Sequence, residues 1–341
     1  MGPEANAINQ PAALSPQEQI MGMILGIVQG RSLVAAVELG IADVLATGPL
    51  PLEDLAARTQ ANADNLFRLL RALETLGFFR QVTPRVFSNT PLSEWLRRDV
   101  PGSQWAFVHL LAPGMGLWDG YSEMLGTIRT GKNALFQRWG CNLWEHLRRY
   151  PERAEIFQQA MRSMNDPMTQ AVTTAYDWAV FPVIVDVGGG IGAQLVDILN
   201  AYPGCRGILF DQPEVVAANI PHSRISKVSG SFFNEIPAGS DAYLLRNILH
   251  DWDDPDAARI LRTLRNSTKA DARIMLVEWL IPDNSEFHFG KWADMTMMAG
   301  LGGRERTRAE FDRLFFDSGF ELEAIVPTAS TFTIIVGRPI D

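Results

Sequence analysis

The segment from Val183 to Leu199 constrains the fold of this chain more than any other. Three apolar residues lead through Asp186 into the turn Gly188-Gly189-Gly190-Ile191-Gly192, and an apolar-periodic run follows. This order predicts a buried strand, a tight loop and a helix. Glycines let the loop backbone adopt positive φ and approach a ligand closely, and the N–H groups at the helix start face that ligand. The segment therefore predicts a small-molecule site at the edge of an α/β sheet.

Candidate strands recur throughout the chain after residue 182. They lie at 183–187, 206–210, 225–229, 241–246, 272–278, 320–326 and 331–337. Helical patterns separate the first five, which predicts a mostly parallel sheet covered on both faces. The last two are joined only by Pro327–Ser330, a connection that allows an antiparallel hairpin and nothing else. We expect an α/β fold with a Rossmann-like, seven-stranded, mostly parallel sheet that has one antiparallel strand near its edge.

The first hundred residues follow a different plan. A helix is expected from Pro16 to about Gly30, and a second helix over Arg31–Leu39. Shorter helices near 52–57 and 62–73 precede a hairpin of 77–80 with 85–88, which is the layout of a winged helix. The apolar positions of the first helix fit a buried stripe: Ile20, Met23, Ile24, Ile27 and Val28.

A winged helix indicates either DNA binding or a dimerisation module. Residues 1–100 contain 8 Arg and no Lys against 10 Asp and Glu, whereas a DNA-binding surface carries a basic face. We therefore favour the dimerisation module over a winged-helix regulator and expect no nucleic-acid partner.

The composition of the 341 residues narrows the protein class further. An apolar content of 47% and a net charge of −9 describe a globular protein with no general affinity for nucleic acid or anionic membranes. Two cysteines fit a reducing compartment, and the five histidines form no metal-binding pair, so no metal is expected. No apolar run reaches the roughly 18–20 residues that span a bilayer, which predicts a cytoplasmic protein with no membrane partner.

The glycine loop alone does not identify its ligand. Gly188-x-Gly190-x-x-Ala193 also fits the dinucleotide fingerprint, so an NAD-dependent dehydrogenase is one alternative. Asp186 at the strand end suits a cationic amine but would repel a pyrophosphate, and Asp211 at the next strand end can accept ribose hydroxyls. Together with the reversed strand, these features favour S-adenosylmethionine (SAM).

Four segments in order carry a family resemblance. They are Asp186–Gly192, Asp211–Val216, Ala242–Trp252 and Gly302–Thr307. The chain resembles the class I SAM-dependent small-molecule O-methyltransferases, the metal-independent group that includes caffeate, acetylserotonin, hydroxyneurosporene and bacterial polyketide or phenazine methyltransferases. The resemblance implies a winged-helix-like dimerisation domain at 1–105, a helical linker at 106–175 that contributes to the acceptor pocket, and a SAM-binding catalytic domain at 176–341. It also implies a homodimer and S-adenosylhomocysteine (SAH) as the product.

The resemblance also implies a role for each matching residue. His250 would be the general base, flanked by Glu278 and Glu305, because a phenol with a pKa near 10 needs a base and histidine suits neutral pH. Arg246 stands where lysine is commoner, and Ser231 where the family often has an aspartate at the adenine. The cofactor-binding residues would be Asp186, Gly188, Gly190, Gly192, Asp211, Ser231, Phe232, Arg246 and Trp252.

The acceptor would lie against a wall rich in methionine. Such walls accept flat apolar rings and discriminate little among them, which predicts a small aromatic or polyketide-type hydroxyl compound as substrate. One further acid in this region, Asp294, has no role assigned from the sequence. A SAM-binding relative that performs hydroxylation, decarboxylation or pericyclic chemistry is the main alternative. The expected pocket residues are Phe157, Met161, Met164, Trp292, Met295 and Met298.

Overall fold

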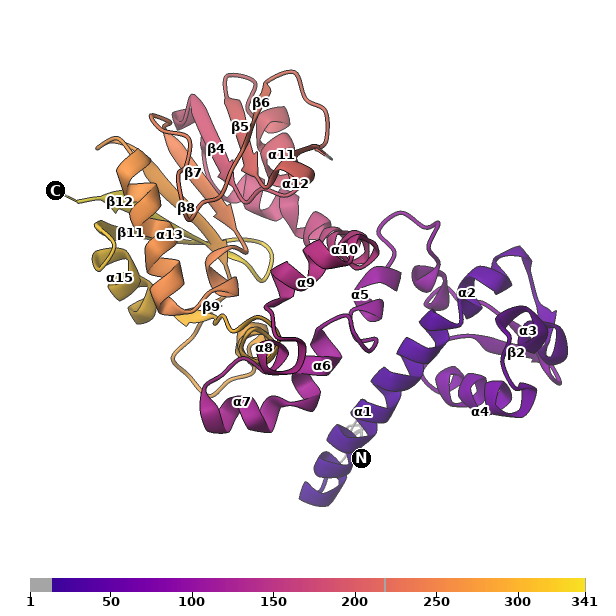
Figure 1. Ribbon diagram of the computed structural model, residues 1–341. Coiled ribbons are helices and arrows are strands. Elements are labelled where there is room, and N and C mark those ends of the chain that lie inside the picture. The colour runs from indigo at the N-terminus through magenta and orange to yellow at the C-terminus, as the bar shows by residue number, and fades with distance from the viewer. Residues whose placement is uncertain (1–13, 218, 341) are drawn as a thin grey trace, which may run out of the picture. The chain divides into compact units, whose positions relative to one another are not determined.

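The computed structural model describes residues 14–217 and 219–340 of the chain. Within it the chain divides into two compact units, Met1–Leu111 and Ala112–Asp341. Figure 1 shows the helices and strands of both units.

The first unit has the predicted order of helices and hairpin. Helix α3 and helix α4 precede strands β2 and β3, and the three-stranded sheet has the order β1-β3-β2 with antiparallel pairs. The elements are α1 (Pro16–Glu38), α2 (Ile41–Val44), η1 (Leu45–Thr47), β1 (Leu50–Pro51), α3 (Leu52–Thr59), α4 (Ala63–Glu74), β2 (Arg80–Thr83), β3 (Val86–Ser88), η2 (Ser93–Leu96) and α5 (Trp105–His109).

Helix α1 differs from the sequence expectation in its length. Ser15 and Glu18 form a capping box at its start, and the helix continues through Gly30 for 23 residues instead of ending there. A glycine inside a helix costs only about 1 kcal/mol relative to alanine. Gly30 therefore does not end the helix, because the residues before and after it favour helical structure. The helix ends before Gly40, whose φ of +63° a side chain would disfavour.

The expected buried stripe on α1 is wrong for the single chain. Ile20 is 59% exposed and Met23 is 73% exposed, and their apolar neighbours up to Val28 are exposed as well. The sequence pattern identifies an apolar helix but does not say whether the residues that pack against it belong to the same chain or to another one. By length and composition alone, α1 is also apolar enough to cross a membrane, which corrects the expectation that no segment reaches that length.

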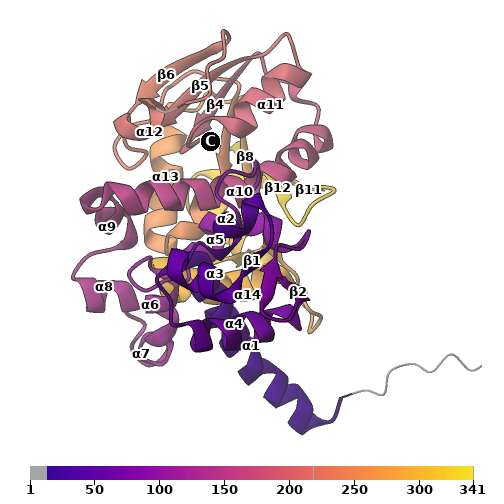
Figure 2. The same cartoon turned by 90° about the vertical axis from the view of Figure 1, so that its right-hand side faces the viewer.

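The second unit begins with a series of helices that lead to its sheet. The long helix α10 contacts both α9 and α11 (Figure 2). These elements are α6 (Leu117–Ser122), α7 (Met124–Thr130), α8 (Ala134–Trp139), α9 (Leu143–Arg149), α10 (Pro151–Ala175) and η3 (Trp178–Val180).

The seven-stranded sheet of the second unit confirms the predicted fold. Its strand order is β11-β12-β8-β7-β4-β5-β6, and β12 runs antiparallel to both of its neighbours while the other pairs are parallel. The elements are β4 (Val183–Val187), α11 (Ala193–Ala201), β5 (Arg206–Asp211), α12 (Pro213–Ala217), β6 (Ile225–Ser229), β7 (Ala242–Arg246), η4 (Leu249–Asp251), α13 (Asp254–Ser267), β8 (Arg273–Glu278), β9 (Leu280–Ile281), α14 (Phe289–Thr296), the π-helical turn η5 (Met297–Leu301), β10 (Arg306–Thr307), α15 (Arg308–Phe316), β11 (Phe320–Pro327) and β12 (Thr333–Pro339).

Both faces of the sheet are buried, as the apolar strand sequences predict. Alternate strand residues such as Val185 and Leu245 pack with α13 and α15 in one cluster. Their neighbours Ile184 and Leu244 pack with α10, α11 and α14 in the other cluster. Because the faces are covered, ligands have access at the strand ends, and parallel strands bring their carboxyl ends to one edge.

Candidate active site

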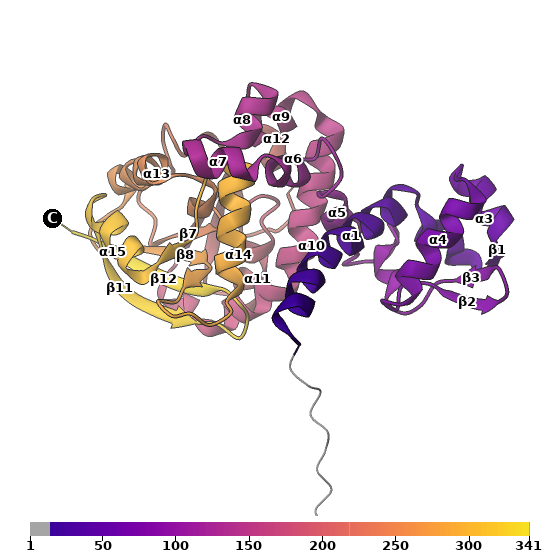
Figure 3. The ribbon, with the colours of Figure 1, turned by 90° about the horizontal axis from the view of Figure 1, so that it is seen from below.

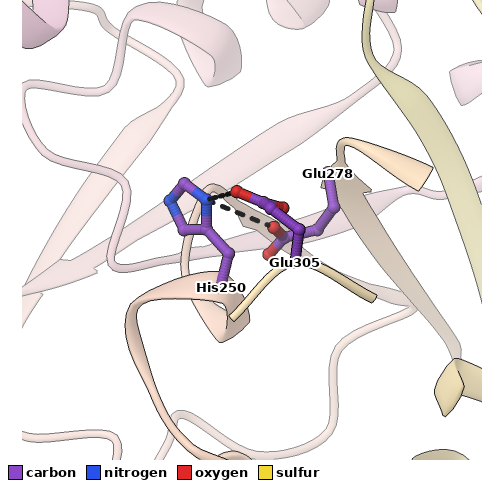
Figure 4. Close-up of side chains that lie close together, drawn as sticks. All are labelled: His250, Glu278 and Glu305. Carbon is purple, nitrogen blue, oxygen red and sulfur yellow. Dashed lines mark hydrogen bonds and ion pairs between the residues drawn. The ribbon is translucent and has the colours of Figure 1, made fainter. Parts of the chain in front are cut away.

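A buried histidine and two glutamates lie together at the carboxyl edge of the sheet. His250 belongs to η4, which follows β7, and Glu278 is the last residue of β8. Nδ1 of His250 lies 2.7 Å from Oε1 of Glu305 and 3.9 Å from Oε2 of Glu278 (Figure 4). His250 is 6% exposed, Glu278 0% and Glu305 2%, so bulk water does not screen these charges. The structure therefore brings together the three residues that the sequence predicts as a catalytic set.

Glu278 is fixed by backbone groups of the segment that carries His250. Its Oε1 accepts hydrogen bonds from the N–H groups of Ile248 (3.2 Å) and Leu249 (3.0 Å). Burial raises the pKa of Glu278 to about 7, partly opposed by His250. Glu278 thus both shapes the turn before His250 and presents a carboxylate to its imidazole.

The pKa of His250 reflects two opposing influences. Burial alone would lower it, but the carboxylates of Glu305, Asp251 and Glu278 outweigh burial and raise it to about 10. Asp251 was not expected here: its Oδ1 lies 3.4 Å from Nε2 of His250, on the opposite side of the ring from Glu305. Burial likewise raises the pKa of Asp251 to about 7. The imidazole therefore holds its proton far more strongly than a free histidine.

The segment Gly302–Arg306, which contains Glu305, lies directly against the backbone that carries His250. Arg304 donates its backbone N–H to the carbonyl of His250 at 2.9 Å. A Cβ on Gly303 would lie 2.0 Å from that carbonyl oxygen, so no side chain fits there. The fully buried Arg306 donates to the carbonyls of Leu249 and Trp252, both at 3.0 Å. These backbone contacts explain how Glu305 reaches a histidine 55 residues earlier in the chain.

The same three residues could in principle hold a metal ion. One ligand atom from each of His250, Glu278 and Glu305 lies within 4.8 Å of the others. The separation of 2.7 Å between Nδ1 and Glu305 is the length of a charge-assisted hydrogen bond, so a proton satisfies both atoms.

The glycine loop has the backbone geometry that the sequence predicts. Gly188, Gly190 and Gly192 have φ of +68°, +60° and +85°. Oδ2 of Asp211 accepts the N–H of Gly190 at 2.8 Å, and Oδ1 accepts that of Gln212 at 2.6 Å. Asp211 thus joins the loop to the end of β5, and each of its oxygens retains a lone pair for a ligand hydroxyl.

Asp186 lies beneath this loop with an unsatisfied oxygen. Its side chain is 1% exposed, and its Oδ2 has no hydrogen-bond partner among the described residues. Burial and the nearby charge of Asp211 raise its pKa to about 7. Gly189, which the sequence analysis did not single out, is required above it, since a Cβ there would lie 2.4 Å from the carboxyl carbon. A buried, unpaired carboxylate under a glycine loop fits a site for a ligand with a cationic group.

Aromatic side chains lie next to the loop. Phe232 is 6.0 Å from Trp252 between ring centroids in an edge-to-face arrangement, and it approaches Gly188. Ser231 is half-buried, and its hydroxyl accepts the N–H of Phe233 at 3.4 Å. Phe232 and Trp252 thus form an apolar surface, and these are residues for which the sequence predicts contact with the cofactor.

Arg246 is joined to two residues that the sequence analysis missed. Its guanidinium donates to Thr169 Oγ1 at 3.0 Å and to Gln194 Oε1 at 2.9 Å. Gln194 is buried and also donates to the hydroxyl of Thr173. Gln194 thus links α10, α11 and the end of β7, a connection that no local motif reveals.

The expected acceptor residues are distributed over α10, α14 and the π-helical turn. Met161, Met295 and Met298 are half-buried, and Trp292 is 61% exposed. Phe157 packs edge-to-face with Trp144, and Met164 packs against the core cluster of the sheet. Helix α14 contacts α6, where the hydroxyls of Tyr121 and Thr296 are 2.9 Å apart (Figure 3). The π-helical turn directly follows α14 and ends at Gly302.

A Rossmann-like sheet with an acid-flanked glycine loop and a buried histidine beside it is the arrangement of a small-molecule enzyme site, and the comparisons with known proteins identify its class. Residues 121–321 match the family model of the O-methyltransferase domain, and residues 21–99 match that of the O-methyltransferase dimerisation domain. The chain belongs to this family and is a SAM-dependent O-methyltransferase. The dimerisation domain supports a homodimer.

Individual relatives agree with the family. A phenazine O-methyltransferase of Lysobacter antibioticus is 38% identical, covering 97% of this chain and 99% of that protein. The crystal structure of LaPhzM matches with a TM-score of 0.91 at 37% identity, covering 96% of this chain and 100% of that one. The O-methyltransferase NcsB1 from neocarzinostatin biosynthesis was solved with SAM and 2-hydroxy-5-methyl naphthoic acid. It matches with a TM-score of 0.81 at 30% identity, and the match covers 91% of this chain and 96% of that one.

Proposed function

We propose that this enzyme transfers a methyl group from SAM to a hydroxyl of a small aromatic or polyketide-type natural product, with His250 as the general base. The observation that carries the proposal is the buried contact of 2.7 Å between Nδ1 of His250 and Glu305. This contact fixes the imidazole and leaves Nε2 as the nitrogen that takes the proton. SAM supplies the electrophilic methyl group when it is bound.

The raised pKa of His250 suits a phenolic acceptor. Proton transfer is most efficient when donor and acceptor have similar pKa values, and a phenol has a pKa near 10. With the pKa of the imidazole raised to about 10, transfer of the phenolic proton to Nε2 is nearly balanced. Glu305 and Glu278 stabilise the imidazolium that results, because their carboxylates face Nδ1.

The residues around the glycine loop would bind the cofactor. Asp186 has a buried oxygen without a partner, which suits the amino group of the methionine portion. Asp211 would accept the ribose hydroxyls, and the loop glycines allow the backbone to approach the cofactor. Phe232 and Trp252 would border the adenine beside Ser231, and Arg246 would face the carboxylate of SAM.

The acceptor assignment rests on the pocket residues and on the relatives. Half-buried methionines on α10 and α14 offer a soft apolar surface for a flat ring. One relative is named for phenazine methylation, and another was solved with a hydroxylated naphthoic acid. A cytoplasmic location fits the two cysteines, which are free and buried.

Incubation with methyl-labelled SAM and a panel of hydroxyphenazines, naphthols and simple phenols tests this function. Label should enter at least one hydroxyphenazine or naphthol, and the rate should be unchanged after dialysis against EDTA. Conversion of a substrate without label would instead support the non-methylating alternative. Absence of SAM binding in calorimetry would contradict the whole assignment.

The pH dependence of kcat/KM should show the raised pKa of His250. A base must be neutral to accept a proton, so kcat/KM should keep rising above pH 8 and level off near pH 10, not near pH 6.5. In Glu305→Gln one carboxylate that raises this pKa is lost, so the rising limb should move to lower pH and the maximal rate should fall. Initial rates at saturating SAM from pH 6 to 10.5 measure both effects, and a wild-type plateau already reached at pH 7.5 would contradict the assignment.

We also propose that the exposed apolar surface of α1 lies in the homodimer interface. Ile24→Asp should shift the protein from dimer to monomer in sedimentation equilibrium, because a carboxylate would be desolvated there. Gln19→Glu adds the same charge at a polar position of α1 and is the matched control. If Ile24→Asp remains as dimeric as the wild type, this surface is not the interface.

A further inference from the structure

One acid of helix α14 contacts the loop that supplies Glu305. The chain leaves α14 through the π-helical turn, reverses at Gly302 with a φ of +85°, and returns so that Glu305 lies near Asp294. Oδ1 of Asp294 accepts the backbone N–H of Glu305 at 2.9 Å. This bond closes the loop between the helix on the acceptor side and the residue that faces His250.

We propose that Asp294 is a positioning residue for the His250–Glu305 pair, holding the backbone of Glu305 and tying the pair to helix α14. The inference rests on the proposed function in which His250 is the general base. The hydrogen bond of Asp294 goes to the backbone of Glu305 and not to His250 or Glu278, so Asp294 acts through Glu305.

The geometry at Glu305 makes this bond matter. The side chain of Glu305 is 2% exposed, and its Oε1 makes the contact of 2.7 Å with His250. A shift of the backbone N by even a fraction of an ångström moves that carboxylate, and hydrogen bonds weaken steeply with distance and angle. Loss of the acceptor leaves the N–H of Glu305 unsatisfied inside the protein, which favours such a shift.

An acid is an unfavourable choice here for stability alone. Burial raises the pKa of Asp294, and the charge of Glu305 raises it further, while the hydrogen bond from Glu305 lowers it. An asparagine would accept the same N–H without bringing a second negative charge near Glu305. The hydrogen bond, and not the charge, is therefore the feature that positions Glu305, so a neutral acceptor oxygen should serve in its place.

Helix α14 is also the element through which an acceptor could influence the pair. Met295 follows Asp294 directly, and Met298 lies in the π-helical turn that continues α14. A Cβ on Gly120 of α6 would lie 2.6 Å from the carbonyl oxygen of Ala299, so this turn is tightly packed. A methyl acceptor that binds against Met295 and Met298 would therefore influence the position of Glu305 through Asp294.

Two substitutions at Asp294 separate positioning from other roles. We expect Asp294→Ala to lower kcat by about 10–100-fold with little change in the KM for SAM, the size of one lost buried hydrogen bond. The rising limb of its pH profile should move to lower pH, in the direction of Glu305→Gln. Asp294→Asn keeps an acceptor oxygen and should recover most of kcat. Asp283→Ala, which removes an exposed acid between β9 and α14, is the matched control and should match the wild type.

The outcomes are distinguishable from failure of the proposed function. Titration of ¹⁵N-labelled His250 by NMR needs no acceptor, and its pKa should be lower in Asp294→Ala than in the wild type. Unchanged kcat and unchanged titration in Asp294→Ala would overturn the proposal. A rise in acceptor KM alone would also overturn it, because Asp294 would then contact the acceptor. If Asp294→Ala does not fold, an Asp294→Asn variant with the rate and pH profile of Glu305→Gln would refute positioning through the hydrogen bond.

Discussion

Replacement of His250 with alanine should lower kcat for methyl transfer by about 10²–10⁴-fold, the usual contribution of a general base. The acceptor proton then loses the imidazole nitrogen that would take it, since the carboxylates of Glu305 and Glu278 lie on the Nδ1 side of the ring and not at Nε2. SAM affinity measured by calorimetry should stay near the wild-type value, because no cofactor-binding residue is altered. The rate of the variant should recover toward high pH as the phenol ionises in solution.

The control for His250→Ala is His109→Ala. His109 belongs to α5 of the first unit, where its ring stacks on that of Trp105. This variant should transfer methyl groups at the wild-type rate. A His250→Ala enzyme with unchanged kcat at pH 7.5 would show that the base lies elsewhere, and Asp251, beside Nε2, would become the first candidate.

The common location of several predicted site residues follows from simple sheet geometry. Asp186, Arg246 and Glu278 lie in or at the ends of parallel strands, so strand prediction alone gathers them at one edge. All seven strands were predicted to within about two residues. The central strands β4, β7 and β8 are short, buried apolar runs, whereas the edge strand β6 is mostly exposed and was recognised by its place between two helical patterns. The contact between His250 and Glu305 was implied by the family resemblance and not by local pattern.

Features that depend on contacts between distant segments could not be predicted in this way. The sequence shows that α1 is apolar, but not that its stripe is exposed in the single chain. It shows Gln194 as one polar residue in an apolar helix, and only the structure places it beside Arg246. Asp294 likewise looks like an ordinary helical acid until Glu305 folds back onto it. A polar residue in a buried helical face is the only local signal that could have drawn attention to these positions.

Gly189→Ala should lower the affinity for SAM by about 10–100-fold, although Gly189 does not have the positive φ of the neighbouring loop glycines. Backbone strain is therefore not the reason for this loss. An added Cβ would lie 2.4 Å from the carboxyl carbon of Asp186 and 2.6 Å from a methyl group of Leu209. Both neighbours are buried and cannot move freely, and overpacking of this kind costs about 1–3 kcal/mol.

Calorimetry with SAM measures this loss, and Gly204→Ala is the matched control. Gly204 lies between α11 and β5, has no positive φ, and a Cβ there would meet nothing within 4 Å. Gly204→Ala should therefore bind SAM as the wild type does. If Gly189→Ala also binds normally, Asp186 must be able to rotate out of the way without loss, and its carboxylate is then not the group that holds the cofactor amine. Gly189 would then matter for packing alone, and another residue near the glycine loop would have to bind the amino group of SAM.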